Sequence, residues 1–271
     1  MTWSERVATN SAEILAAGRW RQLRVLDGGG PEFRLAGGRE VVSFASNDYL
    51  GLSQHAAVVA AAGAALDRWG AGTGSSRLVV GTRPIHADLE AALAEWRGTE
   101  AALVFPTGYQ ANLAALTIFG TGARIVSDEL NHASLIDGAR LARADVEVYR
   151  HGDVDHAEDL VKGAPGPAVV VSDSVFSMDG DVAPIAALSE VCARHQALLI
   201  LDDAHACLDI PAPDPAAECL RVGTLSKALG SQGGYLAGPR SWIDLMVNRA
   251  RSFIFTTALA PASAAAALAA V

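Results

Sequence analysis

The chain has 271 residues, of which 51% are hydrophobic and 19% are charged, and its net charge is −9. This composition provides enough apolar side chains for a sizeable buried core and excludes a disordered chain. The negative charge argues against a surface for nucleic acids or anionic membranes, although a local basic pocket remains compatible with it.

The cysteines and the two ends of the chain indicate a cytoplasmic protein. Cys192, Cys207 and Cys219 lack CxxC spacing, so a reduced protein is expected, with neither a disulfide framework nor a zinc site. Residues 1–6 do not lead into an apolar stretch of the kind found in signal peptides, so no signal peptide is expected. The alanine-rich residues 258–271 are too short for a membrane span and predict a buried helix.

Helical and strand patterns alternate along most of the chain. In chain order, the expected elements are helix 4–20, strand 41–44, helix 56–69, helix 86–96, strand 101–105, helix 110–119, strand 124–127, helix 135–143, strand 146–149, helix 155–162, strand 168–171, helix 185–195, strands 198–201, 220–224 and 235–237, and helix 242–251. This order predicts an α/β fold with a mostly parallel central sheet covered by helices on both faces. Ligands of such sheets bind beyond the carboxyl ends of the strands.

Three regions are expected along the chain. Residues 1–50 form an N-terminal helix and short strand, residues 51–255 form the major domain, and residues 256–271 begin a C-terminal region. The helical pattern reaches Val271 without a cap or stop signal, so we expect the chain to end short of a further C-terminal domain.

Lys227 lies in a turn of small and hydroxyl-bearing residues, 223–230. The other lysine of the chain, Lys162, occupies a polar helix end before a glycine, a typical exposed position. Lys227 is therefore the candidate for a Schiff base with pyridoxal 5′-phosphate (PLP), and Thr224 and Ser226 offer hydroxyl groups to a phosphate. The alternative for Lys227 is a solvated surface side chain.

Two carboxylates follow the most apolar strand of the chain, 197–201. Buried carboxylates require partners, and neighbouring side chains on a strand point to opposite faces, so one of the two can face a given ligand. We favour Asp202 as the partner of a protonated pyridine nitrogen and His205 as the partner of the ring oxygen. The alternatives are a simple pair of loop acids and a metal site. The lack of a third nearby ligand argues against the metal site.

Other candidates lie where a strand runs into a helix or turn. Gly108 and Tyr109 could form a phosphate cradle at a helix start, although the pattern also fits an ordinary turn. His132 could stack on a planar cofactor and donate a proton, or it could belong to a helix-capping segment in which Asn131 or Ser134 is the cap. Ser177 could contact the cofactor, which is compatible with a turn built on Asp-Gly.

Taken together, these motifs resemble those of the α-oxoamine synthases, a family of PLP enzymes of aminotransferase fold type I. The resemblance is carried by residues 46–51 (SNDYLG), 74–79 (GSSRLV), 86–90 (HADLE), 131–134 (NHAS), 176–181 (FSMDGD), 202–205 (DDAH) and 224–227 (TLSK). It implies a homodimer with the site at the subunit interface.

The resemblance also implies roles for individual residues. Lys227 would hold PLP and later remove the Cα proton of the amino acid, while Asp202 would pair with the pyridine nitrogen and His205 with the ring hydroxyl. His132 would stack on the ring and act as an acid. The remaining implied contacts are those of Gly108, Tyr109 and Thr224 with the phosphate region, of Ser177 with the cofactor, and of Arg21 with a substrate carboxylate.

Within the family, Arg21 and residues 76–79 favour the biotin-pathway member, which condenses L-alanine with a pimeloyl thioester on coenzyme A or a carrier protein and releases carbon dioxide and free thiol. The alternatives are a sister enzyme that uses glycine or serine, and a non-catalytic PLP-binding fragment. Two departures from the family pattern motivate the last alternative. A proline-containing segment, 206–219, replaces a longer glycine-rich one, and we expect the chain to lack the C-terminal domain that would bind the amino-acid carboxylate.

Overall fold

The computed structural model describes residues 1–206 and 212–271, so Cys207 and part of the altered segment 206–219 lie outside the described residues. The chain divides into two compact units, residues 1–45 and residues 46–271.

The first unit contains one helix and a small antiparallel sheet. Helix α1 (Trp3–Ala16) begins with a capping box between Thr2 and Glu5, and no residue of the helix is buried. It ends before the expected residue 20, because Gly18 takes a positive φ of 64° just after its last turn. Strands β1 (Leu26–Asp27), β2 (Glu32–Leu35) and β3 (Glu40–Val42) pair in that order. The sequence predicted only the third.

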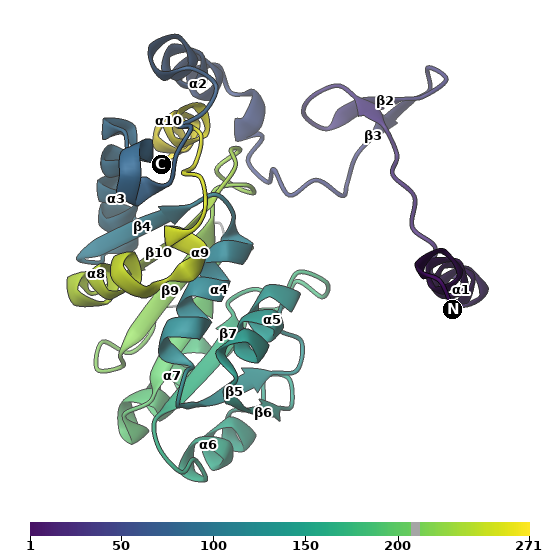
Figure 1. Cartoon of the computed structure of the whole chain (residues 1–271). Helices are drawn as coiled ribbons and strands as arrows, with labels where there is room; N and C mark the ends of the chain where they lie inside the picture. The colour runs from purple at the N-terminus through teal and green to yellow at the C-terminus, as the bar shows by residue number, and fades with distance from the viewer. Residues whose placement is uncertain (207–211) are drawn as a thin grey trace. The chain divides into compact units, whose positions relative to one another are not determined.

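The second unit is an α/β domain, and its elements can be followed in Figure 1. Its helices are η1 (Leu52–Gln54), α2 (Ala56–Trp69), the π-helical turn η2 (Arg77–Gly81), α3 (Pro84–Arg97), α4 (Gly108–Phe119), α5 (Ala133–Ala142), α6 (Val154–Lys162), α7 (Ile185–His195), α8 (Arg240–Arg249), α9 (Arg251–Ile254) and α10 (Pro261–Ala270). Its strands are β4 (Ala101–Phe105), β5 (Arg124–Asp128), β6 (Asp145–Tyr149), β7 (Ala168–Asp173), β8 (Leu198–Asp202), β9 (Cys219–Thr224) and β10 (Gly234–Gly238).

The strands form one sheet in the order β4-β10-β9-β8-β7-β5-β6. Strands β6, β5, β7, β8 and β9 are parallel to their neighbours in this group, whereas β10 runs antiparallel to both β9 and β4. The predicted mostly parallel sheet is confirmed. Its parallel strands all end at the same edge, which places the residues that follow them close together.

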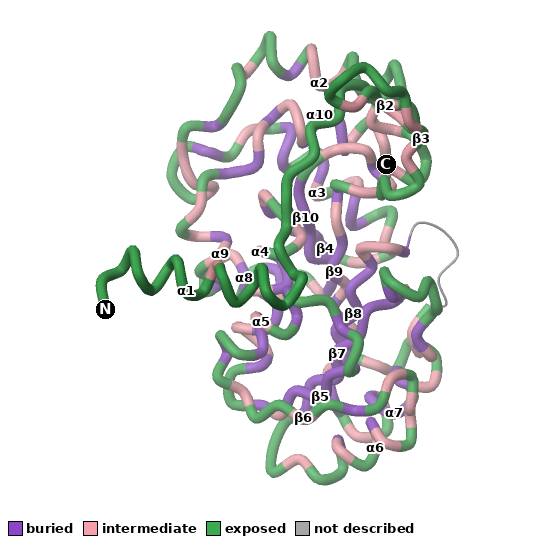
Figure 2. The backbone as a smooth tube through the Cα atoms, turned by 90° about the vertical axis from the view of Figure 1, so that its right-hand side faces the viewer, coloured by how far each residue is buried: buried purple, intermediate pink, exposed green. Residues whose placement is uncertain are grey.

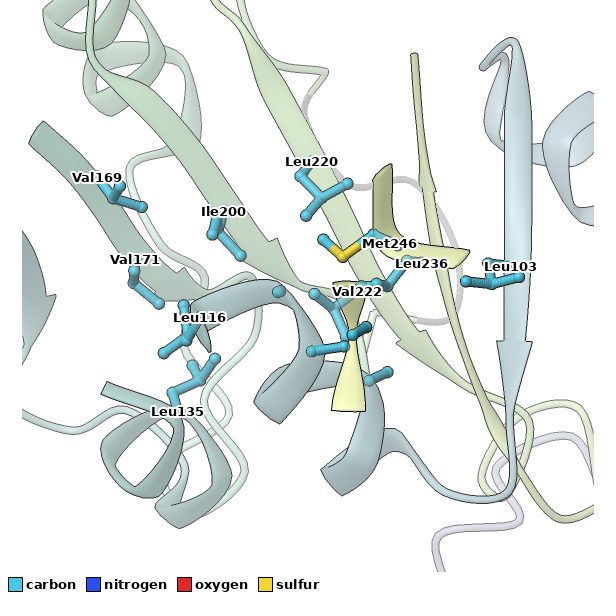
Figure 3. Packing of buried hydrophobic residues seen from close by; sticks show 14 of the residues in the cluster. Leu103, Leu116, Leu135, Val169, Val171, Ile200, Leu220, Val222, Leu236 and Met246 are labelled. Carbon is cyan, nitrogen blue, oxygen red and sulfur yellow. The ribbon is translucent and has the colours of Figure 1, made fainter. Parts of the chain in front are cut away.

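Alternation of side chains along the strands explains why both faces carry helices. Val169, Val171 and Ile200 pack in a core with residues of α4, α5, α8 and α9, whereas Val170 and Leu199 pack on the opposite face with residues of α6 and α7. Figure 3 shows the first of these cores, with Leu116 of α4 and Leu135 of α5 beside β7 and β8. Helices α3 and α10 cover the β4–β10 end of the second face.

The burial pattern follows this layering, with buried strands between helices that are exposed on their outer sides (Figure 2). The alanine-rich end forms the expected buried helix, α10, which packs against α2 and α3. One expected helix, 242–251, is two helices, because Ala250 takes an extended conformation (ψ 105°) between α8 and α9. Within the described residues, no helix is both long and apolar enough to cross a membrane.

Candidate active site

A cavity of about 190 Å³ opens at the carboxyl edge of the parallel strands in the second unit. It is lined by Thr107, Gly108, Tyr109, Asn112, His132, Ser134, Asp173, Ser177, Asp202, Ala204, His205, Gly223, Thr224, Ser226 and Lys227. All eight site residues predicted in this unit are among them. Arg21 is an exposed residue of the first unit, and its role stays a prediction.

Lys227 lies in the connection between β9 and β10, which is closed by hydrogen bonds at its base. The Leu225 N–H donates to the Gly233 carbonyl at 2.9 Å, and the Thr224 hydroxyl donates to the same oxygen at 2.9 Å. Within the turn, the Gly230 N–H donates to the Lys227 carbonyl at 2.9 Å. The lysine backbone is therefore fixed at the rim of the cavity, with its side chain half-buried.

Helix α4 begins beside this turn. Thr107 caps the helix by accepting the Gln110 N–H at 3.1 Å. A Cβ on Gly234 would lie 2.4 Å from the Gly108 backbone, so the glycine at the start of β10 lets the helix approach the sheet. The first N–H groups of α4 and the hydroxyls of Thr224 and Ser226 thus meet at one end of the cavity, an arrangement that binds phosphate.

Asp202, at the end of β8, is the buried carboxylate of the cavity. Its Oδ2 accepts the Asn112 Nδ2–H at 2.6 Å, and its Oδ1 accepts the Ala204 N–H at 2.9 Å. Burial raises the pKa of Asp202, while the bond from Asn112 and the charge of Lys227 oppose that rise. A ligand with a protonated ring nitrogen would supply the positive partner that favours the ionised carboxylate.

Asp203 faces the opposite side of the sheet, as predicted. Its side chain accepts hydrogen bonds from the Ser174 hydroxyl and, at 2.7 Å, from Arg221 Nε. The two adjacent acids therefore have separate partners, and only Asp202 lines the cavity.

A second acid of the cavity, Asp173, was not predicted. It ends β7 directly opposite Asp202 in the strand register and is buried. Burial, together with the charge of Asp202, raises the pKa of Asp173 to about 7. Its Oδ2 accepts the backbone N–H of His132 at 2.8 Å. The sequence signal was present, since Asp173 ends an apolar strand as Asp202 does.

His132 lines the cavity at the N-terminus of α5. It is itself the cap of that helix, so the alternative in which Asn131 or Ser134 is the cap is wrong. Asn131 instead bonds to the end of β7, because its amide donates to the Val171 carbonyl at 2.8 Å and accepts the Asp173 N–H at 2.9 Å. His132 Nδ1 lies 2.8 Å from the Ser134 hydroxyl.

His205 and Ser177 complete the set of predicted residues in the cavity. The Tyr49 hydroxyl lies 2.7 Å from His205 Nδ1. Tyr49 lies in the motif 46–51, but the sequence indicated no role for it. Burial and the charges of Lys227 and His132 lower the pKa of His205 to about 4, so this ring is neutral near neutral pH. Ser177 is exposed on the segment that follows β7.

The donor set fits PLP and does not suggest a metal. An amine, a buried carboxylate, an imidazole and an anion cradle converge on one cavity, which are the groups that hold a pyridoxal ring, its aldehyde and its phosphate. Across residues 1–206 and 212–271, no group of three or more His, Cys, Asp or Glu residues is arranged to hold a metal ion.

Comparisons with known proteins agree with this arrangement. Residues 39–270 match the family model of class I and II aminotransferases. The chain is 54% identical over 238 residues to an 8-amino-7-oxononanoate synthase of Methylobacterium sp. (strain 4-46), an alignment that covers 86% of this chain and 62% of the relative. It is 46% identical over 292 residues to an 8-amino-7-oxononanoate synthase of Acidithiobacillus ferrooxidans, covering 99% of this chain and 74% of the relative.

Solved structures show the same fold. A serine palmitoyltransferase from S. paucimobilis with a bound PLP–myriocin aldimine superposes with a TM-score of 0.87 at 28% identity, covering 97% of this chain and 72% of that one. An 8-amino-7-oxononanoate synthase from Francisella tularensis gives a TM-score of 0.69 at 26% identity, covering 83% and 66%. The chain thus spans 62% of the length of the Methylobacterium relative. By its sequence and its fold, the chain belongs to the class I and II aminotransferase family and, within it, to the 8-amino-7-oxononanoate synthase branch of the α-oxoamine synthases.

Proposed function

We propose that this chain binds PLP and performs the decarboxylative condensation of L-alanine with a pimeloyl thioester, giving 8-amino-7-oxononanoate, carbon dioxide and free thiol in biotin synthesis. The acyl group arrives on coenzyme A or on a carrier protein. The observation that carries the proposal is the presence of Lys227 and Asp202 in one cavity with a helix-start anion cradle. The names of the similar proteins support the choice of reaction.

The residues of the cavity divide into those that hold the cofactor and those that move protons. Lys227 would hold PLP through its amine, and Asp202 would accept a hydrogen bond from the ring nitrogen. Gly108, Tyr109 and Thr224 would hold the phosphate, and His205 and Ser177 would contact the rest of the cofactor. Bound PLP supplies an electron sink for a carbanion at the substrate Cα.

Proton transfer falls to Lys227 and His132. The Lys227 amine would take the Cα proton of L-alanine. His132 would stack on the cofactor ring and donate a proton to the reacting acyl oxygen. Arg21 is proposed to bind the distal carboxylate of the pimeloyl group, for which a bidentate guanidinium is suited.

A homodimer and a cytoplasmic location are part of the proposal. The free Cys192 and Cys219 support a reducing compartment. The names of the similar proteins, which are biosynthetic enzymes, support the same location.

The experiment is a PLP titration of the purified chain, followed by absorbance in the visible range. Binding should produce a visible band, and borohydride reduction followed by peptide mass spectrometry should locate PLP on Lys227. Lys162→Ala is the matched control for Lys227→Ala, since the chain has only these two lysines. A band that survives in Lys227→Ala would contradict the assignment of the lysine.

The substrates are tested on the same sample. A band that changes with L-alanine but little with glycine or serine, together with thiol release from pimeloyl-coenzyme A, supports the proposed reaction. A response to glycine or serine instead would indicate a sister enzyme. A band that ignores all three amino acids would indicate a PLP-binding chain without turnover.

A further inference from the structure

A chain of hydrogen bonds connects Asp202 to His132 through two residues of the cavity that have had no role so far. Asn112 Nδ2 donates to Asp202 Oδ2 at 2.6 Å and to the Ser134 hydroxyl at 2.8 Å. The Ser134 hydroxyl in turn lies 2.8 Å from His132 Nδ1. Asn112 and Ser134 are 2% and 1% exposed, so water does not compete for these bonds.

The direction of each bond follows from the donors and acceptors available. An ionised carboxylate only accepts, so Asn112 turns its NH₂ group toward Asp202. The second hydrogen of that NH₂ group goes to the Ser134 oxygen, which leaves the Ser134 hydroxyl hydrogen for His132. The opposite amide orientation would place Asn112 Oδ1 against the carboxylate. With Nδ2 toward Asp202, Asn112 Oδ1 has no hydrogen-bond partner among the described residues. The two hydrogen bonds of Nδ2 alone therefore fix the orientation of the amide.

His132 Nδ1 therefore meets two donors. They are the Ser134 hydroxyl at 2.8 Å and the Ser134 backbone N–H at 3.3 Å. A ring nitrogen that faces two donors carries a lone pair, so the proton of the neutral ring must lie on Nε2.

We propose that Asn112 and Ser134 are positioning residues that fix the proton of neutral His132 on Nε2 and tie the orientation of that ring to Asp202. Nε2–H is then the donor that His132 can offer to a molecule in the cavity. The catalytic meaning of this donor rests on the proposed function, whereas the tautomer itself does not.

The test is the tautomer of His132, measured by ¹⁵N NMR on the full chain with labelled histidine, without and with PLP. His132→Gln identifies the His132 signals among those of the seven histidines. In the wild type we expect two widely separated ring-nitrogen signals, with the protonated one assigned to Nε2.

Two variants test the positioning residues. Ser134→Ala removes the hydroxyl, so the two His132 signals should move toward each other as both tautomers become populated. Asn112→Ala frees the Ser134 hydroxyl to reorient and should give a smaller shift in the same direction. Thr117→Ala is the matched control, because Thr117 also lies on α4 but donates only within its own helix, and the His132 signals should not move.

A wild-type His132 with its proton on Nδ1 would overturn the proposal, and this result does not depend on any variant folding. A folded Ser134→Ala that keeps the wild-type signals would also overturn it. If the wild-type tautomer is as expected but PLP gives no visible band, the proposed function fails and the positioning network stands. If the band forms and the tautomer is wrong, only this inference fails.

Discussion

Asp202 and Asp173 end adjacent strands and lie opposite each other, yet only one of them has a hydrogen bond from a side-chain amide. Asn112 donates to Asp202, whereas Asp173 accepts a backbone N–H from His132. Burial raises the pKa of Asp173, and the charge of the nearby Asp202 raises it further. The sequence located Asp202 from its apolar strand, but only the register of β7 and β8 shows that Asp173 is its neighbour.

The raised pKa of Asp173 predicts a pH-dependent contribution to stability. The folded protein keeps this proton up to about pH 7, while the unfolded chain loses it near 3.8. The contribution of Asp173 is therefore complete below the unfolded pKa and is lost as the pH rises toward 7. In Asp173→Asn this loss should vanish. Between about pH 4 and pH 7, the free energy of unfolding of the variant should therefore rise relative to that of the wild type by up to about 1.4 kcal/mol per pH unit.

Urea unfolding of both proteins at about pH 5 and about pH 8 measures this difference. The amide oxygen that replaces the carboxylate in Asp173→Asn can still accept the His132 N–H, so the bond itself is retained. An identical pH dependence in the two proteins would show that Asp173 is ionised in the folded state throughout.

Gly234 predicts a steric effect on the anion cradle. A Cβ at this position would lie 2.4 Å from backbone atoms of Gly108, which cannot rotate away. Gly234→Ala should therefore displace the start of α4, lower the free energy of unfolding by about 1–3 kcal/mol and weaken PLP binding by about tenfold or more. Gly166→Ala, where an added Cβ would meet nothing within 4 Å, is the control. Equal PLP affinity in the two variants would show that the close approach is not needed.

At the scale of elements, the sequence predicted the long strands and helices within a few residues. The motif at residues 74–79 gave no sign of what the structure shows at Arg77, which is held by an ion pair. Arg77 Nη1 lies 2.8 Å and Nη2 3.0 Å from the two carboxylate oxygens of Glu90, and both side chains are largely buried. The sequence around Arg77 and Glu90 does not reveal this pair, because η2 and α3 meet only through tertiary packing.

This ion pair should be important for folding. Arg77→Leu leaves the buried Glu90 carboxylate without its cation, so we expect a loss of about 3–5 kcal/mol in the free energy of unfolding. Arg150→Leu breaks an exposed pair with Asp153 and should lose less than about 1 kcal/mol. Chemical denaturation of both variants measures the difference, and similar losses would contradict the structural role of Arg77.

At the scale of the whole molecule, the strand–helix alternation predicted the sheet and its covering on both faces. The antiparallel direction of β10 was not predicted, because periodicity does not report strand direction. The cavity residues were recognised largely because each follows a strand, and parallel strands bring their carboxyl ends together. Asn112 was missed because it lies within the apolar helix α4, where only tertiary structure reveals its partners.

The division into two units predicts that the cofactor site does not need the first one. Every residue that lines the cavity belongs to residues 46–271. A fragment of these residues should therefore fold and bind PLP with an affinity within a few-fold of that of the full chain, while Arg21-dependent steps are lost. Comparison of PLP titrations and urea unfolding curves tests this. A fragment that fails to fold would show that the division does not reflect independent stability.

The antiparallel direction of β10 has a consequence for how Lys227 is presented. Because β10 returns beside β9, the chain that carries Lys227 closes on itself through Leu225 and Gly233. The conformational entropy of this loop is lost when the protein folds, so cofactor binding does not have to order it. An inserted residue would break the pairing at the base of the loop or move the amine along the rim. We therefore expect the length of residues 225–233 to be among the least variable features in natural variants of this chain.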